Sequence, residues 1–125
     1  MRGAMRVLKA AADVQRARIL LLLGGRELCV CQIVEVLQLA PSTVSKHLSL
    51  LEAADWIAHR KQGRWVYYRL NEEAAASLAP LLQWMCAGMQ RDPVARADAK
   101  RLQDILRIDP EILCERQRPS ARRAK

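Results

Sequence analysis

The sequence predicts a small, mainly α-helical domain with a β-hairpin, arranged as a winged helix-turn-helix. Two helix-like stretches, 32–39 and 42–54, are separated by Ala40-Pro41, where proline interrupts helical backbone. Two β-prone runs follow, on either side of Gln62-Gly63, a pair typical of a two-residue hairpin turn. In a helix-turn-helix the second helix lies in the major groove of DNA, and a hairpin placed directly after it is a wing.

Two further helices are expected ahead of this motif. Residues 5–12 have helical composition, and the run 14–23, capped by Asp13, is apolar nearly all round and is therefore expected to be buried. Gly24-Gly25 is expected to end that helix because glycine adopts left-handed backbone angles at low cost. Residues 27–31 are then expected to open the first helix of the motif.

The helix at 42–54 is expected to read DNA, with Ser42 as its N-cap. Its apolar residues Val44, Leu48 and Leu51 recur at i, i+4 and i+7, so one face packs inward. The other face carries short hydroxyls and one cation and no acid, which suits a groove lined by phosphates. The DNA-binding residues predicted on this face are Ser42, Thr43, Ser45, Lys46 and Ser49.

The hairpin is expected to contact DNA as well. Residues 56–70 contain four basic residues and no acid. The tip of such a wing can reach phosphate or the minor groove, so Lys61 and Arg64 complete the predicted DNA interface. The aromatic residues of the second strand are expected to pack within the sheet rather than to stack on bases.

The remainder of the chain predicts two helices and a tail. Asn71 can cap a helix at 72–90, whose apolar stripe is longer than one small domain needs and therefore predicts a homodimer seam. A last helix at 93–108 completes a DNA-binding and dimerisation domain, 1–108. Residues 109–125 are expected to form a basic C-terminal tail that is largely disordered and anchored only at 112–114.

Length and charge fit one DNA-binding domain. The chain has 125 residues and a net charge of +8, and five of its basic residues lie at 116–125. A basic surplus favours double-stranded nucleic acid as the partner. The sequence shows neither a membrane-spanning apolar run nor a secretory signal, so a cytoplasmic protein with reduced cysteines is expected. An enzyme is the least favoured class, because no phosphate-binding glycine loop, nucleophile–histidine–acid set or carboxylate pair is recognisable.

Three segments carry a family resemblance: ELCVCQI at 27–33, STVSKHLSLL at 42–51 and GRWVYYRL at 63–70. In this order they resemble the ArsR/SmtB family of winged-helix metalloregulatory repressors, in its arsenical-responsive branch. The resemblance implies a homodimer, formed through the first and fifth helices, that represses an arsenic-resistance operon. It implies that no cofactor is needed for DNA binding. It also implies that arsenite, as As(III), or Sb(III) releases the operator by binding Cys29 and Cys31, at the family's Cys-Val-Cys positions.

A third thiolate ligand is expected elsewhere in the chain, because Val34 stands where arsenical-responsive members often place another cysteine. The candidates are Cys86, on the apolar stripe of the helix at 72–90, and Cys114, on a segment that could fold back from the same or the partner subunit. We favour Cys114, with binding by two thiolates as the alternative. As(III) is a soft, three-coordinate ion that prefers thiolates, so the predicted ligands are Cys29, Cys31 and Cys114.

The expected position of these cysteines suggests how a ligand could affect DNA binding. At a helix N-terminus the dipole lowers the pKa of a thiol. Residues two apart on a helix point roughly 200° away from each other, so binding one ion would distort the helix start and shift the recognition helix. Two alternatives remain open. Cys29 with Cys31, or Cys29 with Cys114, could form a dithiol that senses oxidants or persulfides, or the chain could be an architectural DNA binder that senses nothing.

Overall fold

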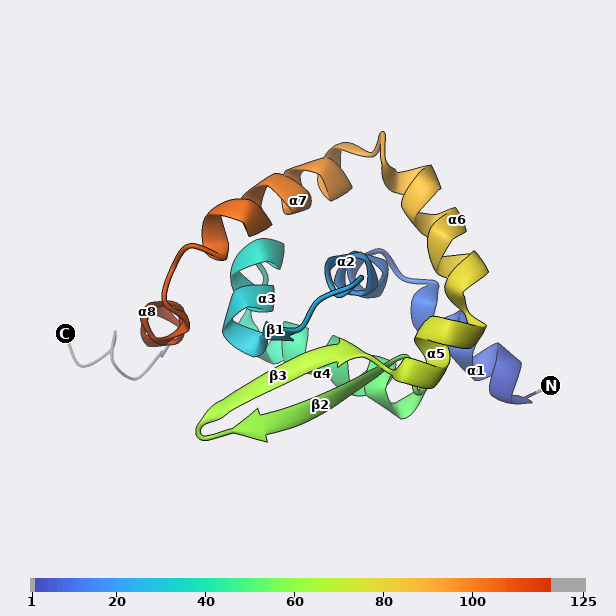
Figure 1. The fold of residues 1–125 in the computed structure, drawn as a ribbon, viewed down its shortest axis with the longest axis horizontal. Helices are drawn as coiled ribbons and strands as arrows, with labels where there is room; N and C mark the ends of the chain where they lie inside the picture. Colours follow the sequence, from blue (N-terminus) through green and yellow to red (C-terminus); the bar gives the residue numbers. More distant parts are fainter. Residues whose placement is uncertain (1, 118–125) are drawn as a thin grey trace.

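The computed structural model describes residues 2–117 and shows eight helices around a three-stranded antiparallel sheet (Figure 1). The helix-turn-helix and the hairpin after it are both present, so the predicted fold class is confirmed. None of the described helices is both long and apolar enough to cross a membrane. The elements are α1 (Arg2–Ala11), α2 (Val14–Leu22), β1 (Leu28–Cys29), α3 (Val30–Leu37), α4 (Pro41–Ala53), β2 (Ile57–Gln62), β3 (Trp65–Leu70), α5 (Glu72–Ser77), α6 (Ala79–Met89), α7 (Pro93–Ile105) and α8 (Pro110–Arg116).

The sheet has the order β1-β3-β2 and contains one strand that the sequence did not predict. Residues 27–31 were expected to open a helix, but Leu28 and Cys29 form β1 and α3 begins only at Val30. The reason is the free edge of β3, which supplies backbone partners for β1 and leaves both of its side chains buried. The hairpin turn lies at Gly63-Arg64, one residue later than predicted, because Gln62 pairs with Trp65.

Local capping chemistry explains most helix ends. The Asp13 carboxylate accepts hydrogen bonds from the backbone of Gln15 and Arg16, and the Asn71 side chain caps α5, as predicted. The prediction that Ser42 caps the recognition helix is wrong. Ala40 is the N-cap of α4, and Pro41 occupies the first helical position, where its missing N–H is no loss.

The predicted helix at 72–90 is divided into α5 and α6 at Leu78. Pro80, in the first turn of α6, cannot donate a backbone hydrogen bond and its ring clashes with a preceding turn, so a continuous helix is excluded. The predicted last helix ends earlier than expected, at Ile105 instead of residue 108.

The segment expected to be a disordered tail begins with a helix. Asp109 caps α8 by accepting a hydrogen bond from the backbone of Glu111 at 2.9 Å. Leu113 is fully buried and joins the main core, so α8 packs against the body of the domain. The rest of the predicted tail, 118–125, lies outside the described residues.

The core lies between α2, α3, α4 and the start of β2. As predicted, Val44, Leu48 and Leu51 of α4 face inward and are buried. Trp56 is the largest fully buried side chain, and its indole N–H donates to the carbonyl of Val7 at 2.7 Å, which attaches α1 to this core. Asp55 takes the left-handed conformation, with φ 62°, that lets the chain turn from α4 into β2.

Helix α7 lies across α2 and α3, on the side away from the hairpin (Figure 1). A buried ion pair holds it there: the Arg18 guanidinium on α2 donates two hydrogen bonds of 2.8 Å to the Asp98 carboxylate on α7. The same guanidinium reaches the carbonyl of Leu37, and Arg101 donates to the carbonyl of Val36. Two arginines therefore satisfy carbonyls at the C-terminal end of α3, which have no partner within the helix.

Replacing Asp98 with alanine leaves Arg18 buried without its counter-charge. We expect the free energy of unfolding to fall by about 3–5 kcal/mol, measured by urea denaturation at fixed protein concentration. The matched control is Asp104→Ala, the same change at an exposed position of α7, which is expected to cost far less. The double variant Arg18→Met/Asp98→Leu is expected to regain most of the loss; equal losses in Asp98→Ala and Asp104→Ala would contradict the assignment.

Candidate functional site

The recognition helix presents the predicted DNA-binding side chains on one exposed face. Ser42, Thr43, Ser45, Lys46 and Ser49 of α4 are all exposed, opposite the buried face of the helix. Lys46 makes no ion pair within the described part of the chain, so its charge is available to phosphate. The helix therefore offers one cation among four small hydroxyls to a groove.

Cations from α1 and α2 lie beside this face, and the sequence analysis missed them. Arg6, Lys9 and Arg16 line a groove between α1 and α4, with Leu50 on its wall. Arg16 is positioned by a 2.6 Å hydrogen bond to the carbonyl of Ala10. Arg6 and Lys9 lie on α1 and Arg16 lies on α2, so only the folded chain reveals that all three are close to α4.

The wing carries the predicted Lys61 and Arg64 at its exposed end, but acids from outside the hairpin approach its cations. Arg64 forms an ion pair with Glu111 of α8 at 2.5 Å. Arg60 forms one with Glu27 at 2.6 Å, which lowers the pKa of that carboxyl. Lys61 makes no ion pair with any described residue. These pairings could not be predicted from local sequence patterns, because Glu27 and Glu111 are 33 and 47 residues from their partners.

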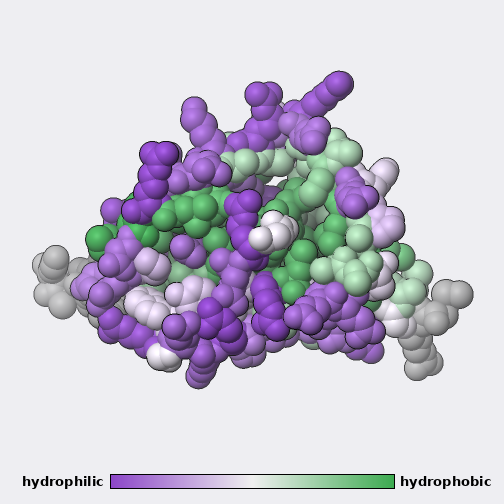
Figure 2. Space-filling view, in the orientation of Figure 1, coloured by the Kyte–Doolittle hydropathy of each residue, from purple (hydrophilic) through white to green (hydrophobic). Residues whose placement is uncertain are grey.

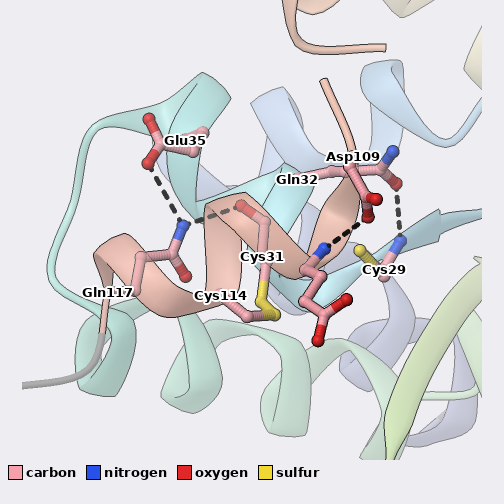
Figure 3. Close-up of a disulfide and its surroundings, with 8 residues drawn as sticks. Cys29, Cys31, Gln32, Glu35, Asp109, Cys114 and Gln117 are labelled. Atoms are coloured by element: carbon pink, nitrogen blue, oxygen red, sulfur yellow. Dashed lines mark hydrogen bonds between the residues drawn. A yellow bond between two sulfur atoms is a disulfide. The ribbon is translucent and has the colours of Figure 1, made fainter. Parts of the chain in front are cut away.

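The thiol site lies at the start of α3, where α8 folds back onto it. Cys31 of α3 and Cys114 of α8 are joined by a disulfide, with their Cα atoms 5.4 Å apart (Figure 3). The Gln117 amide donates to the carbonyl of Cys31 at 2.9 Å and reaches the Glu35 carboxylate at 3.4 Å. The structure thus brings together two of the three predicted ligands, from helices far apart in the sequence.

Cys29, the remaining predicted ligand, lies apart from this pair. It is 1% exposed at the end of β1, and its backbone N–H donates to the side chain of Gln32 at 2.9 Å. Burial raises the pKa of the Cys29 thiol, and nearby backbone N–H groups oppose this only in part. The expectation that the helix N-terminus lowers this pKa is therefore wrong. Within residues 2–117 no three His, Cys, Asp or Glu side chains form a group that could hold a metal ion.

Cys86 lies on the exposed surface of α6, away from the other cysteines. No residue of α6 is buried, although the helix is largely apolar, and Trp84 is 74% exposed. Figure 2 shows apolar side chains on the side of α6 and also on the opposite side of the molecule, while the edge formed by the hairpin is hydrophilic. Leu81, Leu82 and Met85 of α6 are half-buried against the core, so the apolar surface that this helix leaves uncovered in the single chain is centred on Trp84.

Comparison with known proteins agrees with this architecture. The family model described as "Bacterial regulatory protein, arsR family" matches residues 13–57. The arsenic resistance transcriptional regulator ArsR2 of Pseudomonas putida is 40% identical over 78 residues, which cover 62% of this chain and 68% of that protein. The arsenical resistance operon repressor of Escherichia coli is 34% identical over 100 residues, 78% of this chain and 86% of that protein. The match to ArsR1 of Pseudomonas putida, at 44% identity, covers 54% of this chain and spans about half of that regulator, 53% of its length.

Solved structures show the same fold. HlyU from Vibrio cholerae superimposes with a TM-score of 0.61 at 32% identity, over 68% of this chain and 94% of that one. The homodimeric winged helix-turn-helix DNA-binding domain Mb0332 from Mycobacterium bovis gives a TM-score of 0.62 at 31% identity, over 69% and 80%. With the helix-turn-helix, the wing and these relatives in agreement, the chain belongs to the ArsR family of DNA-binding transcriptional regulators.

Proposed function

We propose that this regulator represses an arsenic-resistance operon and leaves its operator when As(III) or Sb(III) binds its cysteine thiolates. The observation that carries the proposal is the contact between Cys31 and Cys114, which joins the first helix of the helix-turn-helix to α8. The relatives named as arsenic resistance regulators support the choice of inducer. In a reducing cytoplasm the pair is present as two adjacent thiols.

Two adjacent thiols suit arsenite without any change of oxidation state. Each S–H replaces one hydroxide of arsenous acid, so that an S–As bond forms and the thiol proton leaves with the hydroxide as water. Soft thiolate ligands match this soft ion. The chemistry therefore requires only that Cys31 and Cys114 be reduced and close together, and their positions meet the second condition.

Cys29 is proposed as the third ligand, and its position indicates what its participation would require. It is buried before α3 and held by the hydrogen bond from its N–H to Gln32. Turning its sulfur toward Cys31 requires the junction between β1 and α3 to open. Because α3 packs against α4, such a change reaches the recognition helix. Binding by Cys31 and Cys114 alone is the simpler alternative.

Double-stranded operator DNA is the proposed partner of the exposed face of α4, with Lys61 and Arg64 of the wing at its flank. A homodimer would place two such faces on two half-sites of an operator. The exposed Trp84 of α6 supports a dimer seam at this helix, and the Mycobacterium bovis relative is a homodimer.

The disulfide in the structure favours one second candidate, a thiol redox sensor of the same fold. In that case Cys31 and Cys114 lose two protons and two electrons to a peroxide or persulfide, and the new S–S bond changes DNA affinity. The linked pair is Cys31 and Cys114, not a pair containing Cys29 as expected from the sequence, whereas the proposed arsenite site includes all three cysteines.

Arsenite is expected to release the reduced protein from its own promoter DNA, and Cys31→Ser and Cys114→Ser are each expected to abolish this release. Fluorescence anisotropy of labelled DNA measures it, with arsenite, zinc and peroxide added separately. Cys86→Ser is the matched control and should respond like the wild type, since Cys86 lies away from the site. Release by peroxide with no response to arsenite would replace the arsenite proposal with the redox one.

Lys46→Ala is expected to weaken operator binding and to reduce the slope of log K against log salt by about one unit, because one phosphate contact is lost. The control is Lys100→Ala, the same change at an exposed position of α7, the helix on the side away from the hairpin. Binding measured over a salt series distinguishes the two. An equal effect of both variants would show that Lys46 acts only through net charge.

Trp84→Glu is expected to raise the dimer dissociation constant by about 30-fold or more, because buried tryptophans dominate many interfaces. Sedimentation velocity at several protein concentrations measures the change. Leu106→Glu introduces the same charge at another exposed apolar position, 46% exposed at the end of α7, and should leave the dimer intact. Dissociation by Leu106→Glu alone would place the seam elsewhere.

A further inference from the structure

We propose that α8 competes with DNA for the wing: when Cys31 and Cys114 are linked, α8 is held on α3 and its Glu111 carboxylate withdraws Arg64 from DNA. The inference rests on the proposed thiol site and specifies how that site controls DNA binding. It concerns a charge on the wing, whereas the proposed opening of the start of α3 concerns the position of the recognition helix.

The ion pair between Arg64 and Glu111 lies at the surface, where DNA phosphates can compete for Arg64. Arg64, in the hairpin turn, donates to Glu111 at 2.5 Å, and the two side chains are 60% and 58% exposed. An exposed ion pair of this kind contributes little to stability, because water and salt screen it. DNA phosphates can therefore take Arg64 from Glu111 easily, unless something else keeps Glu111 in place.

The other contacts of α8 are too few to hold it firmly. One buried apolar side chain, Leu113, and one side-chain hydrogen bond from Gln117 favour the docked helix. The conformational entropy lost in ordering a seven-residue helix opposes them and is of similar or larger size. The link between Cys114 and Cys31 is thus the interaction that keeps α8 in contact with α3.

The spacing of Glu111 and Cys114 on α8 connects the thiol link to the wing. Glu111 and Cys114 are three residues apart, so they lie on neighbouring positions of one helix face. A bond from Cys114 to Cys31 therefore also fixes Glu111 beside Arg64. The pairing of Arg60 with Glu27 involves no residue of α8, so the link between Cys31 and Cys114 does not change how available Arg60 is to DNA. Of these two arginines, only Arg64 becomes less available to DNA when the link forms.

The test forms the link directly, in the full chain carrying Cys86→Ser to prevent bonding between subunits. Diamide oxidises the two thiols, its azo group taking both protons and both electrons, and peptide mapping verifies the Cys31–Cys114 bond. Anisotropy then gives the affinity for promoter DNA over a salt series. The test variant is Glu111→Gln, and Glu115→Gln is its matched control, an exposed acid on the same helix without an ion pair among the described residues.

In the linked state we expect Glu111→Gln to bind DNA about three- to tenfold more tightly than the parent, with a salt slope steeper by about one unit, because one phosphate contact is regained. Glu115→Gln should change little. In an Arg64→Gln background, Glu111→Gln should have no effect. Equal effects of Glu111→Gln and Glu115→Gln, or an undiminished effect without Arg64, would overturn the proposal.

An arsenite arm separates this inference from the proposed function. If the diamide link weakens binding through Glu111 but arsenite affects no variant, the competition stands and the arsenite site is wrong. If arsenite releases DNA and Glu111→Gln binds no more tightly than the parent in the diamide-linked state, the arsenite site stands and the competition is wrong.

Discussion

The buried ion pair between Arg18 and Asp98 determines where the C-terminal third of the chain lies. Two charges inside a protein are tolerated only when both are well hydrogen-bonded, and here the guanidinium also reaches Gln15 and the carbonyl of Leu37. The pair fixes α7 across α2 and the end of α3. The chain that leaves α7 is thereby directed along α3, so that α8 arrives at the opposite end of that helix. The position of Cys114 thus depends on a charge pair outside the thiol site.

Helix α3 is consequently held at both ends and packed along its length. Arginines from α2 and α7 satisfy its last carbonyls, while α8 and β1 engage its first turn. Because Cys29 pairs with Tyr67 of β3, the start of α3 is also connected to the wing. Close-packed interiors transmit displacements instead of absorbing them. A ligand bound at the first turn of α3, as proposed, would therefore act on both the recognition helix and the hairpin.

The sequence was informative where the signal is local and uninformative where partners are distant. The apolar period of α4, Pro41 and the cap at Asp13 each depend on neighbours within a few residues, and they predicted the motif and the start of α2. Strand β1 has only two residues, which is too short for a period, and exists because β3 offers an edge. The acids at the wing come from distant segments. For the candidate site, the cysteine pattern and the family resemblance suggested three ligands, but only folding shows that Cys31 and Cys114 meet while Cys29 is buried.

The ion pairs of the wing explain why a small free-energy difference is sufficient to control DNA binding. The net charge of +8 suggests strong attraction to DNA, yet Arg60 and Arg64 are both paired with acids of their own chain. Exposed ion pairs are weak, so a DNA phosphate can readily replace the glutamate beside each arginine. A typical allosteric coupling of about 1–3 kcal/mol is therefore enough to determine whether the arginine contacts DNA. Coupling is reciprocal. Under the proposed competition, DNA that recruits Arg64 also loosens α8 and separates Cys114 from Cys31, so operator binding must weaken the affinity for any ligand that bridges the two thiols.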